Sequence, residues 1–221
     1  MGAYEGLSRY FPEGIVNKAH KLGYGEVFIS LLNGDKKSVV QKYNSIWNTL
    51  KQCHYQREGR TPMEFGRDLT SSWLFEDCVL GVLKANGVNV SYGQDYINRK
   101  VFTPRVDKLD TNVTIYVGGK SHSLQIRCDH KLAWSKTNIM YLTESKFKKM
   151  KKRNALMLGF STVDGKMIVM DNSCTKNATY IESYEPYGGR PVWAINISDY
   201  AISDFTFLNA AESIKNYCLY K

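Results

Sequence analysis

The sequence predicts a mixed α/β fold, in which a central mixed β-sheet is flanked by helices. Three observations lead to this prediction. Apolar residues recur at helical spacing from Ser72 to Asn86. Side chains then alternate with a period of two over residues 112–117 and 123–129, as they do in paired strands. Two apolar stretches, residues 155–160 and 166–170, extend the predicted sheet.

Length and composition limit the possibilities further. The chain has 221 residues, 43% of them hydrophobic, which is enough for one large core. We expect residues 1–69 to form a helical region packed on an α/β core of residues 70–221, as one compact domain. No apolar run reaches the length of a membrane span, and the start of the sequence lacks the features of a signal peptide. The five cysteines are scattered without a CxxC pair, which favours reduced thiols and a cytoplasmic protein, in a bacterial cell or a phage-infected host.

The stretch before the core gives weaker signals. Asp35 can cap a helix from Lys36 to about Cys53, whose apolar stripe we assign to packing. A polar loop follows, in which Arg57 and Arg60 are candidate phosphate contacts. The same arginines are equally compatible with a solvated loop.

The helix predicted from Ser72 to Asn86 carries an acid on its apolar side. Glu76 lies inside the face that Phe75, Val79 and Leu83 form, one turn before Leu80. A buried carboxylate is costly unless it meets a proton, a cation or a metal. Glu76 is therefore the first candidate site residue.

The hairpin that follows separates an apolar face from a polar one. Gly118-Gly119 is a permissive two-residue turn between its strands. We expect the polar residues of both strands to meet on one face of the sheet, where Glu76 can approach them. The polar face is predicted to hold Asp110, Asn112, Gln125, Arg127 and Asp129.

This combination resembles the PD-(D/E)xK nucleases, the restriction-endonuclease-like superfamily. The resemblance rests on an acid on a helix, an acid that opens a strand and an acid-x-Lys pair on the next strand, within residues 70–171. It implies a metal-dependent DNA endonuclease, in which carboxylates hold Mg²⁺ or Mn²⁺ that activates water and binds the scissile phosphate. It also implies a DNA partner and, because two strands must be cut, a homodimer.

The resemblance carries over residue by residue. Glu76 matches the helix acid, and Asp110 is the best match to the strand acid, with Asn112 at another place where that acid could fall. Gln125-Ile-Arg127 falls on the (D/E)xK triplet, with a glutamine that is a known variant and an arginine that departs from the pattern. Asp129-His-Lys131 is a second such triplet, and Lys146 could supply the lysine from the following helix. The implied catalytic residues are Glu76, Asp110, Gln125, Arg127, Lys131 and Lys146. The implied metal ligands are Glu76, Asp110, Gln125 and Asp129.

Basic residues concentrate in the part of the chain that holds the candidate site. Residues 1–153 carry a net charge of +11, whereas residues 154–221 carry −2. A polyanion partner such as nucleic acid suits this distribution, although a basic surface also serves solubility. A helix predicted from Thr143 to Arg153 is basic around most of its circumference. Its candidate phosphate contacts are Lys148, Lys149, Lys151, Lys152 and Arg153.

The remaining elements are assigned to the core or to loops. The polar stretch flanked by Trp134 and Tyr141 is predicted to be a loop, and residues 172–207 are predicted to be loop-rich with several aromatic side chains. A strand is expected over residues 192–197 and an amphipathic helix over 209–217.

The motifs of several enzyme classes are absent from the sequence. The sequence contains no GxxxxGK[ST], no GxGxxG after a strand, no HExxH and no GxSxG. Two hypotheses of different classes therefore remain. The first is the metal-dependent DNA endonuclease. The second is a catalytically degenerate nuclease fold that binds nucleic acid or a protein partner, and Asn112, Gln125 and Arg127 favour it.

Overall fold

The computed structural model describes residues 61–93, 113–130, 132–152, 155–187 and 189–220, together with Lys37 and Gln41. The chain divides into two compact units. The first comprises residues 1–78 and 98–110, and the second comprises residues 79–97 and 111–221. The predictions for residues 1–60 lie outside the described residues except at Lys37 and Gln41, which are helical.

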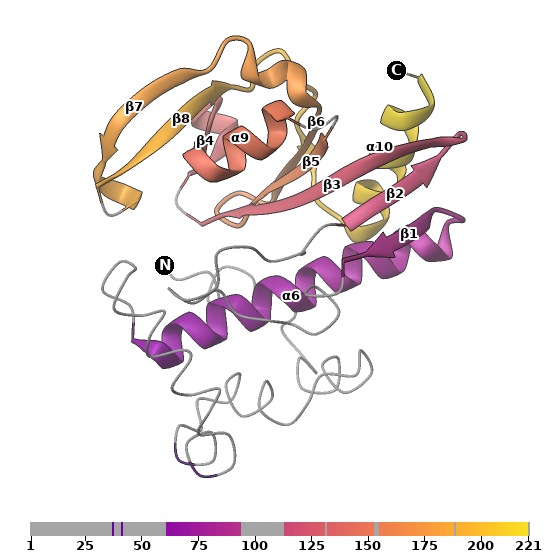
Figure 1. The fold of residues 1–221 in the computed structure, drawn as a ribbon, viewed down its shortest axis with the longest axis horizontal. Coiled ribbons are helices and arrows are strands. Elements are labelled where there is room, and N and C mark those ends of the chain that lie inside the picture. Colours follow the sequence, from indigo (N-terminus) through magenta and orange to yellow (C-terminus); the bar gives the residue numbers. More distant parts are fainter. Residues whose placement is uncertain are drawn as a thin grey trace. The chain divides into compact units, whose positions relative to one another are not determined.

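Helix α6 (Pro62–Ala85) is the main described element of the first unit and continues into the second (Figure 1). It begins well before the predicted Ser72, because Thr61 and Glu64 form a capping box. The Glu64 N–H donates to the Thr61 hydroxyl at 3.2 Å, and the Thr61 N–H donates to the Glu64 carboxylate at 2.7 Å. The helix ends as predicted before Gly87, whose φ of +80° suits a residue without a side chain.

Six strands of the second unit form a mixed sheet, sheet A, in the order β1-β2-β3-β5-β6-β9. Strands β3 and β5 run parallel, and the other neighbouring pairs are antiparallel. The predicted mixed α/β architecture is therefore confirmed. The strands are β1 (Asn89–Tyr92), β2 (Val113–Val117), β3 (Lys120–Asp129), β5 (Ala155–Ser161), β6 (Lys166–Met170) and β9 (Ser203–Asp204).

The connection from β3 to β5 contains three further elements. These are α8 (Trp134–Thr137), β4 (Ile139–Thr143) and α9 (Glu144–Lys152). A crossover of this kind is needed because a tight turn cannot join parallel strands. Helix α9 matches the predicted basic helix, whereas α8 and β4 replace a predicted loop.

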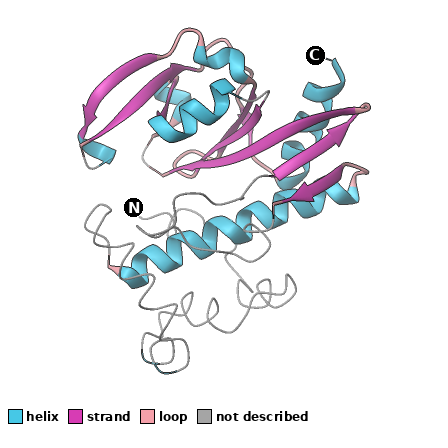
Figure 2. Ribbon diagram, in the orientation of Figure 1, coloured by secondary structure: helices cyan, strands magenta, loops and turns pink. Residues whose placement is uncertain are grey.

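Three antiparallel strands form a second sheet, sheet B, in the order β4-β8-β7. Strand β8 (Arg190–Asn196) overlaps the predicted strand over residues 192–196, and β7 (Thr179–Tyr184) lies in a stretch predicted as loop. Two 3₁₀ turns flank β7, namely η1 (Asn172–Thr175) and η2 (Glu185–Tyr187). Figure 2 shows the strands of both sheets with the helices of the same unit.

A core lies between the two sheets and α9. Strand β5 is buried along its whole length, so it is covered on both faces. Gly159 on β5 allows a close approach, because a Cβ there would lie 2.7 Å from the Trp134 ring. The buried cluster comprises Trp134, Met140, Leu142, Phe147, Met150, Ala155, Met157, Ile168, Met170, Cys174, Ile195 and Ile197.

Helix α10 (Phe207–Tyr220) contains the predicted C-terminal helix and packs against β2 and β6. It buries Ala210, Ala211, Ile214 and Cys218. The Lys215 ammonium also donates to the Asn86 carbonyl at 3.2 Å, which ties α10 to the end of α6 within the second unit. In the part of the chain that the structure describes, no helix carries an apolar stretch of the length that a bilayer crossing requires.

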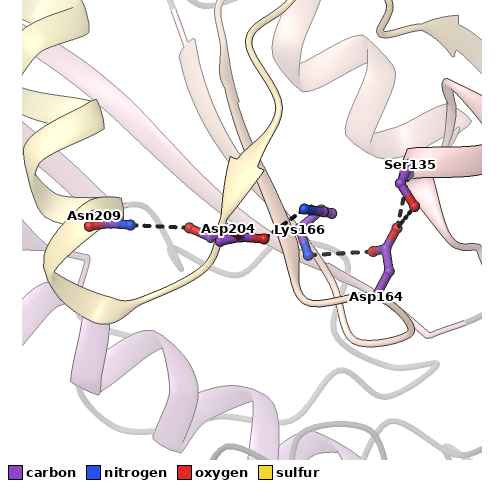
Figure 3. Close-up of polar contacts among 5 residues, drawn as sticks. All are labelled: Ser135, Asp164, Lys166, Asp204 and Asn209. Atoms are coloured by element: carbon purple, nitrogen blue, oxygen red, sulfur yellow. Dashed lines mark hydrogen bonds and ion pairs between the residues drawn. The ribbon is translucent and has the colours of Figure 1, made fainter.

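A chain of polar contacts joins the β5–β6 turn to its neighbours (Figure 3). Asp164 accepts hydrogen bonds from the Ser135 N–H at 2.9 Å and from the Ser135 hydroxyl at 2.7 Å. It thereby caps α8, whose own N-cap residue, Ala133, has no side-chain oxygen. Lys166 forms an ion pair with Asp204 at 2.6 Å. Burial tends to raise the pKa of Asp164, but the hydrogen bonds from Ser135, together with those from Ser161 and Lys166, outweigh it and hold that pKa below its ordinary value.

This cap predicts a pH-dependent contribution to stability. Because the folded-state pKa of Asp164 lies below 3.8, its carboxylate stabilises the fold above that pH and loses this effect as the pH falls through the folded-state pKa. We expect Asp164→Asn to lower the free energy of unfolding by about 1 kcal/mol at neutral pH. The difference from wild type should shrink below pH 3.8, as measured by urea unfolding across pH. Asp199→Asn, in an exposed turn, is the matched control, and an undiminished difference at low pH would contradict the assignment.

Candidate functional site

The hairpin pairs in the register that the predicted alternation requires. Thr114 pairs with Ser123 and Val113 with Leu124, so these polar and apolar side chains lie on opposite faces of sheet A, while His122 pairs with Ile115 on the apolar side. Gln125 and Arg127 continue the polar face along β3. Two members of the predicted polar face, Asp110 and Asn112, lie outside the described residues.

The other predicted site residues are placed as follows. Glu76 lies on α6 in the first unit, where its side chain is half-buried. Its meeting with the polar face of β3 therefore stays a prediction. Lys146 is exposed on α9. The candidates that lie outside the described residues are Arg57, Arg60, Lys131 and Arg153.

Arg127 is buried, with 7% of its surface exposed. One of its terminal nitrogens, Nη2, donates a hydrogen bond to the Tyr187 hydroxyl, and its guanidinium carbon lies 5.6 Å from the centre of the Tyr187 ring. The Arg127 Nε is also buried and has no hydrogen-bond partner within the described ranges. A buried guanidinium is costly without partners, so Tyr187 supplies much of what holds this charge in place.

Tyr187 belongs to a cluster of three tyrosines beside Arg127. The rings of Tyr141 and Tyr184 stack with centres 4.2 Å apart, and the Tyr187 ring lies 5.6 Å from Tyr184. Burial raises the pKa of Tyr187, and the positive charge of Arg127 opposes that shift only in part. Burial likewise raises the pKa of Tyr184, with a further contribution from its hydrogen bond with Tyr141. The phenols of Tyr184 and Tyr187 therefore stay protonated at neutral pH and act as neutral hydrogen-bonding groups.

Asp129 is more deeply buried than Arg127, with 2% of its surface exposed. Its Oδ1 accepts a hydrogen bond from the Leu132 N–H at 3.2 Å. Its backbone carbonyl accepts one from the Thr162 N–H at 2.8 Å, and the Ser161 hydroxyl donates to the Leu132 carbonyl at 2.7 Å. These hydrogen bonds fasten the end of β3 to the end of β5, which gives Asp129 a structural role at this junction.

Helix α9 presents a basic surface. Phe147 and Met150 are buried, and Phe147 stacks on Trp193 with ring centres 4.1 Å apart. This anchoring leaves the lysines of α9 in solvent. Glu144, the one acid on α9, forms an ion pair with Lys148 at 2.7 Å. The exposed lysines predicted to contact phosphates are Lys148, Lys149, Lys151 and Lys152.

The described residues of the second unit supply only part of a binding site for a divalent cation. Among the residues that the structure describes, no three Asp, Glu, His or Cys side chains come together in a way that could hold a metal. Gln125 fits the requirement, because its amide oxygen is a suitable donor and its side chain is half-buried on the polar face. Mg²⁺ binds in an octahedral shell of oxygen ligands. The predicted site therefore requires Glu76 and Asp110 as well as Gln125.

Sequence reasoning did not identify the tyrosine cluster as part of the site. Tyr141, Tyr184 and Tyr187 fall in stretches predicted as loops, and no local pattern links them to Arg127. Comparisons with protein families, with curated proteins and with solved structures found no match for this chain. Its function therefore has to be inferred from the geometry of its own residues.

The contact between Arg127 and Tyr187 predicts a measurable decrease in stability when it is broken. Tyr187→Phe removes the hydroxyl that accepts from Arg127 and leaves a second buried guanidinium nitrogen without that acceptor. We expect the free energy of unfolding to fall by about 1–3 kcal/mol, measured by urea unfolding.

A matched control isolates the hydroxyl of Tyr187. Tyr116 lies on the same sheet as Arg127 but is 46% exposed, so Tyr116→Phe should change the free energy of unfolding by less than about 0.5 kcal/mol. Equal effects in the two variants would show that Tyr187 does not hold Arg127 in place.

Proposed function

We propose that this chain is a metal-dependent endonuclease that cuts DNA, with residues 70–221 as its restriction-endonuclease-like core. The observation that carries the proposal is the position of β3. This strand bears Gln125 and Arg127, lies inside a mixed sheet, and is the second strand of a hairpin that follows an acid-bearing helix. It is connected through the basic helix α9 to the parallel strand β5. That order of elements supports a nuclease-like core.

The proposed metal is Mg²⁺ or Mn²⁺, and Glu76, Asp110 and Gln125 would hold it. When bound, it would supply an activated water for phosphodiester hydrolysis. The chain's own contribution is positive charge near the phosphates, from Arg127 and from Lys131 or Lys146. A homodimer that brings one site to each strand of the duplex is part of this proposal.

Phosphate contacts are assigned to the exposed lysines of α9. Their charge is little neutralised from within the helix, because its single acid pairs with Lys148. Clustered ammonium groups attract a polyanion and release its counterions on binding. The net charge of +11 over residues 1–153 favours the same partner.

Metal-dependent cleavage is the test of this function. We expect the protein to cut plasmid DNA with Mg²⁺ or Mn²⁺ and not with EDTA. Glu76→Gln should lower the cleavage rate by at least about 100-fold, because the amide is a weaker ligand that keeps the same shape. The control is Glu182→Gln, an exposed acid of β7, which should cut at the wild-type rate. Full activity in Glu76→Gln would exclude this site.

A second function is favoured by one specific observation. Arg127, at the position of the superfamily lysine, is buried and engaged by Tyr187 rather than open to solvent. A site arranged in this way suits a protein that binds nucleic acid without cutting it. This second candidate shares the fold and the basic surface of α9 with the first, and it differs in that it requires no metal.

Salt dependence of DNA retention tests the basic surface under either function. Replacing Lys148, Lys149, Lys151 and Lys152 with glutamine should flatten the plot of log affinity against log salt by about 0.9 for each phosphate that is no longer neutralised. The control replaces Lys84, Lys120, Lys176 and Lys215, which are also exposed and carry the same total charge. Equal slopes for the two variants would show that binding follows net charge and that α9 is not the contact surface.

A further inference from the structure

One hollow of the second unit lies outside the residues considered so far. It has a volume of about 400 Å³ and lies at the end of sheet B where β4 begins and β8 ends. We call it the amide pocket. The lining residues in the described part of the chain carry uncharged side chains, and none of them is ionisable. The polar lining consists of Thr137, Asn138, Asn177, Thr179, Asn196 and Ser198.

The frame of the amide pocket is fixed by backbone pairing. Ile139 on β4 pairs with Asn196 on β8, and Thr179 on β7 pairs with Ala194. Asn138 ends α8 in a left-handed conformation with φ of +50°, and its carbonyl accepts a hydrogen bond from the Ile197 N–H at 2.9 Å. The lining side chains therefore project from strands, from the end of α8 and from short turns rather than from a long loop, which favours a preformed site.

The polar groups of the pocket are not all used within the protein. Asn196 Oδ1 accepts from the Ser198 N–H at 2.9 Å, which orients its amide. The side chains of Asn138 and Asn177 are exposed to solvent and make no hydrogen bond to any residue in the described ranges, so they are available to a ligand. Each amide presents a donor and an acceptor side by side. Ile139 and Ala194 complete the lining with apolar surface.

We propose that the amide pocket binds the base of an unpaired nucleotide. Adjacent donor and acceptor groups on asparagine match the edges of nucleobases, as in the bidentate pairing of asparagine with adenine. The apolar surface of Ile139 and Ala194 suits the face of a flat ring. An uncharged lining does not attract a phosphate group, whereas the exposed lysines of α9 attract one. The proposal rests on the proposed function in one respect, namely that DNA is the source of the base.

The volume of the amide pocket agrees with a ligand of the size of one nucleoside. Pockets for small ligands span roughly 300–1,000 Å³. A hollow of about 400 Å³ is therefore large enough for one nucleoside. A base reaches such a pocket only when it is out of the stack, at an end, a bulge or a flipped position. The pocket thus selects for unpaired nucleotides at or near the bound segment.

Direct titration tests the pocket on the full chain. Each of the four deoxynucleosides, and glucose as an uncharged polyhydroxylated comparison, is titrated while the side-chain amide signals of the protein are followed by NMR. We expect at least one deoxynucleoside to bind saturably and glucose not to bind. Asn177→Ala, which removes one amide, and Ala194→Met, which fills the hollow, should each weaken binding about tenfold. Asn216→Ala, on the exposed side of α10, should leave it unchanged.

Three outcomes would overturn the proposal. These are the absence of saturable binding by any deoxynucleoside, equal binding by wild type and both pocket variants, and binding of glucose in place of nucleosides. Retention and cleavage of DNA are measured separately on the same protein. If a deoxynucleoside binds but DNA is neither retained nor cleaved, the pocket is supported and the proposed function is rejected. DNA retention without nucleoside binding removes the pocket alone.

Discussion

The parallel pairing of β3 with β5 is the constraint on which the rest of the second unit depends. Parallel strands cannot be joined by a tight turn, so the chain between them has to cross the sheet and return. That crossover contains α8, β4 and α9. It places β4 where β8 can pair with it, which creates sheet B. The core between the sheets, the basic surface of α9 and the amide pocket all follow from this one connection.

The same pairing fixes the position of the buried Arg127 within sheet A. Arg127 pairs in register with Gly159 on β5, where the absence of a side chain lets the Trp134 ring approach closely. Tyr187 covers the guanidinium and accepts one of its hydrogen bonds. Electrostatic interactions strengthen when water is excluded, and so does the cost of an unpaired donor. The tyrosine cluster therefore holds Arg127 in a defined position.

The chemistry of the second unit is divided among separate surfaces. Lysines on α9 supply charge, the polar face of β3 supplies the amide of Gln125, and the amide pocket supplies neutral hydrogen bonds. A nucleic acid is a ligand with a charged backbone and neutral ring edges, so it can use each of these surfaces for a different part of its structure. The positively charged lysines and the uncharged amide groups lie on separate surfaces. This arrangement links the proposed function to the amide pocket.

Elements with strong local patterns could be predicted without the structure. Period-two alternation around Gly118-Gly119 fixed the hairpin and the shared face of Gln125 and Arg127, and the basic run after Thr143 fixed α9. Only the tertiary structure decided the rest. Strands β4 and β7 exist because β8 pairs with both, and Arg127 meets a tyrosine 60 residues further along the chain. Periodicity reports which face a residue occupies, but contacts between distant segments depend on how the chain closes on itself in space, and no local pattern encodes that.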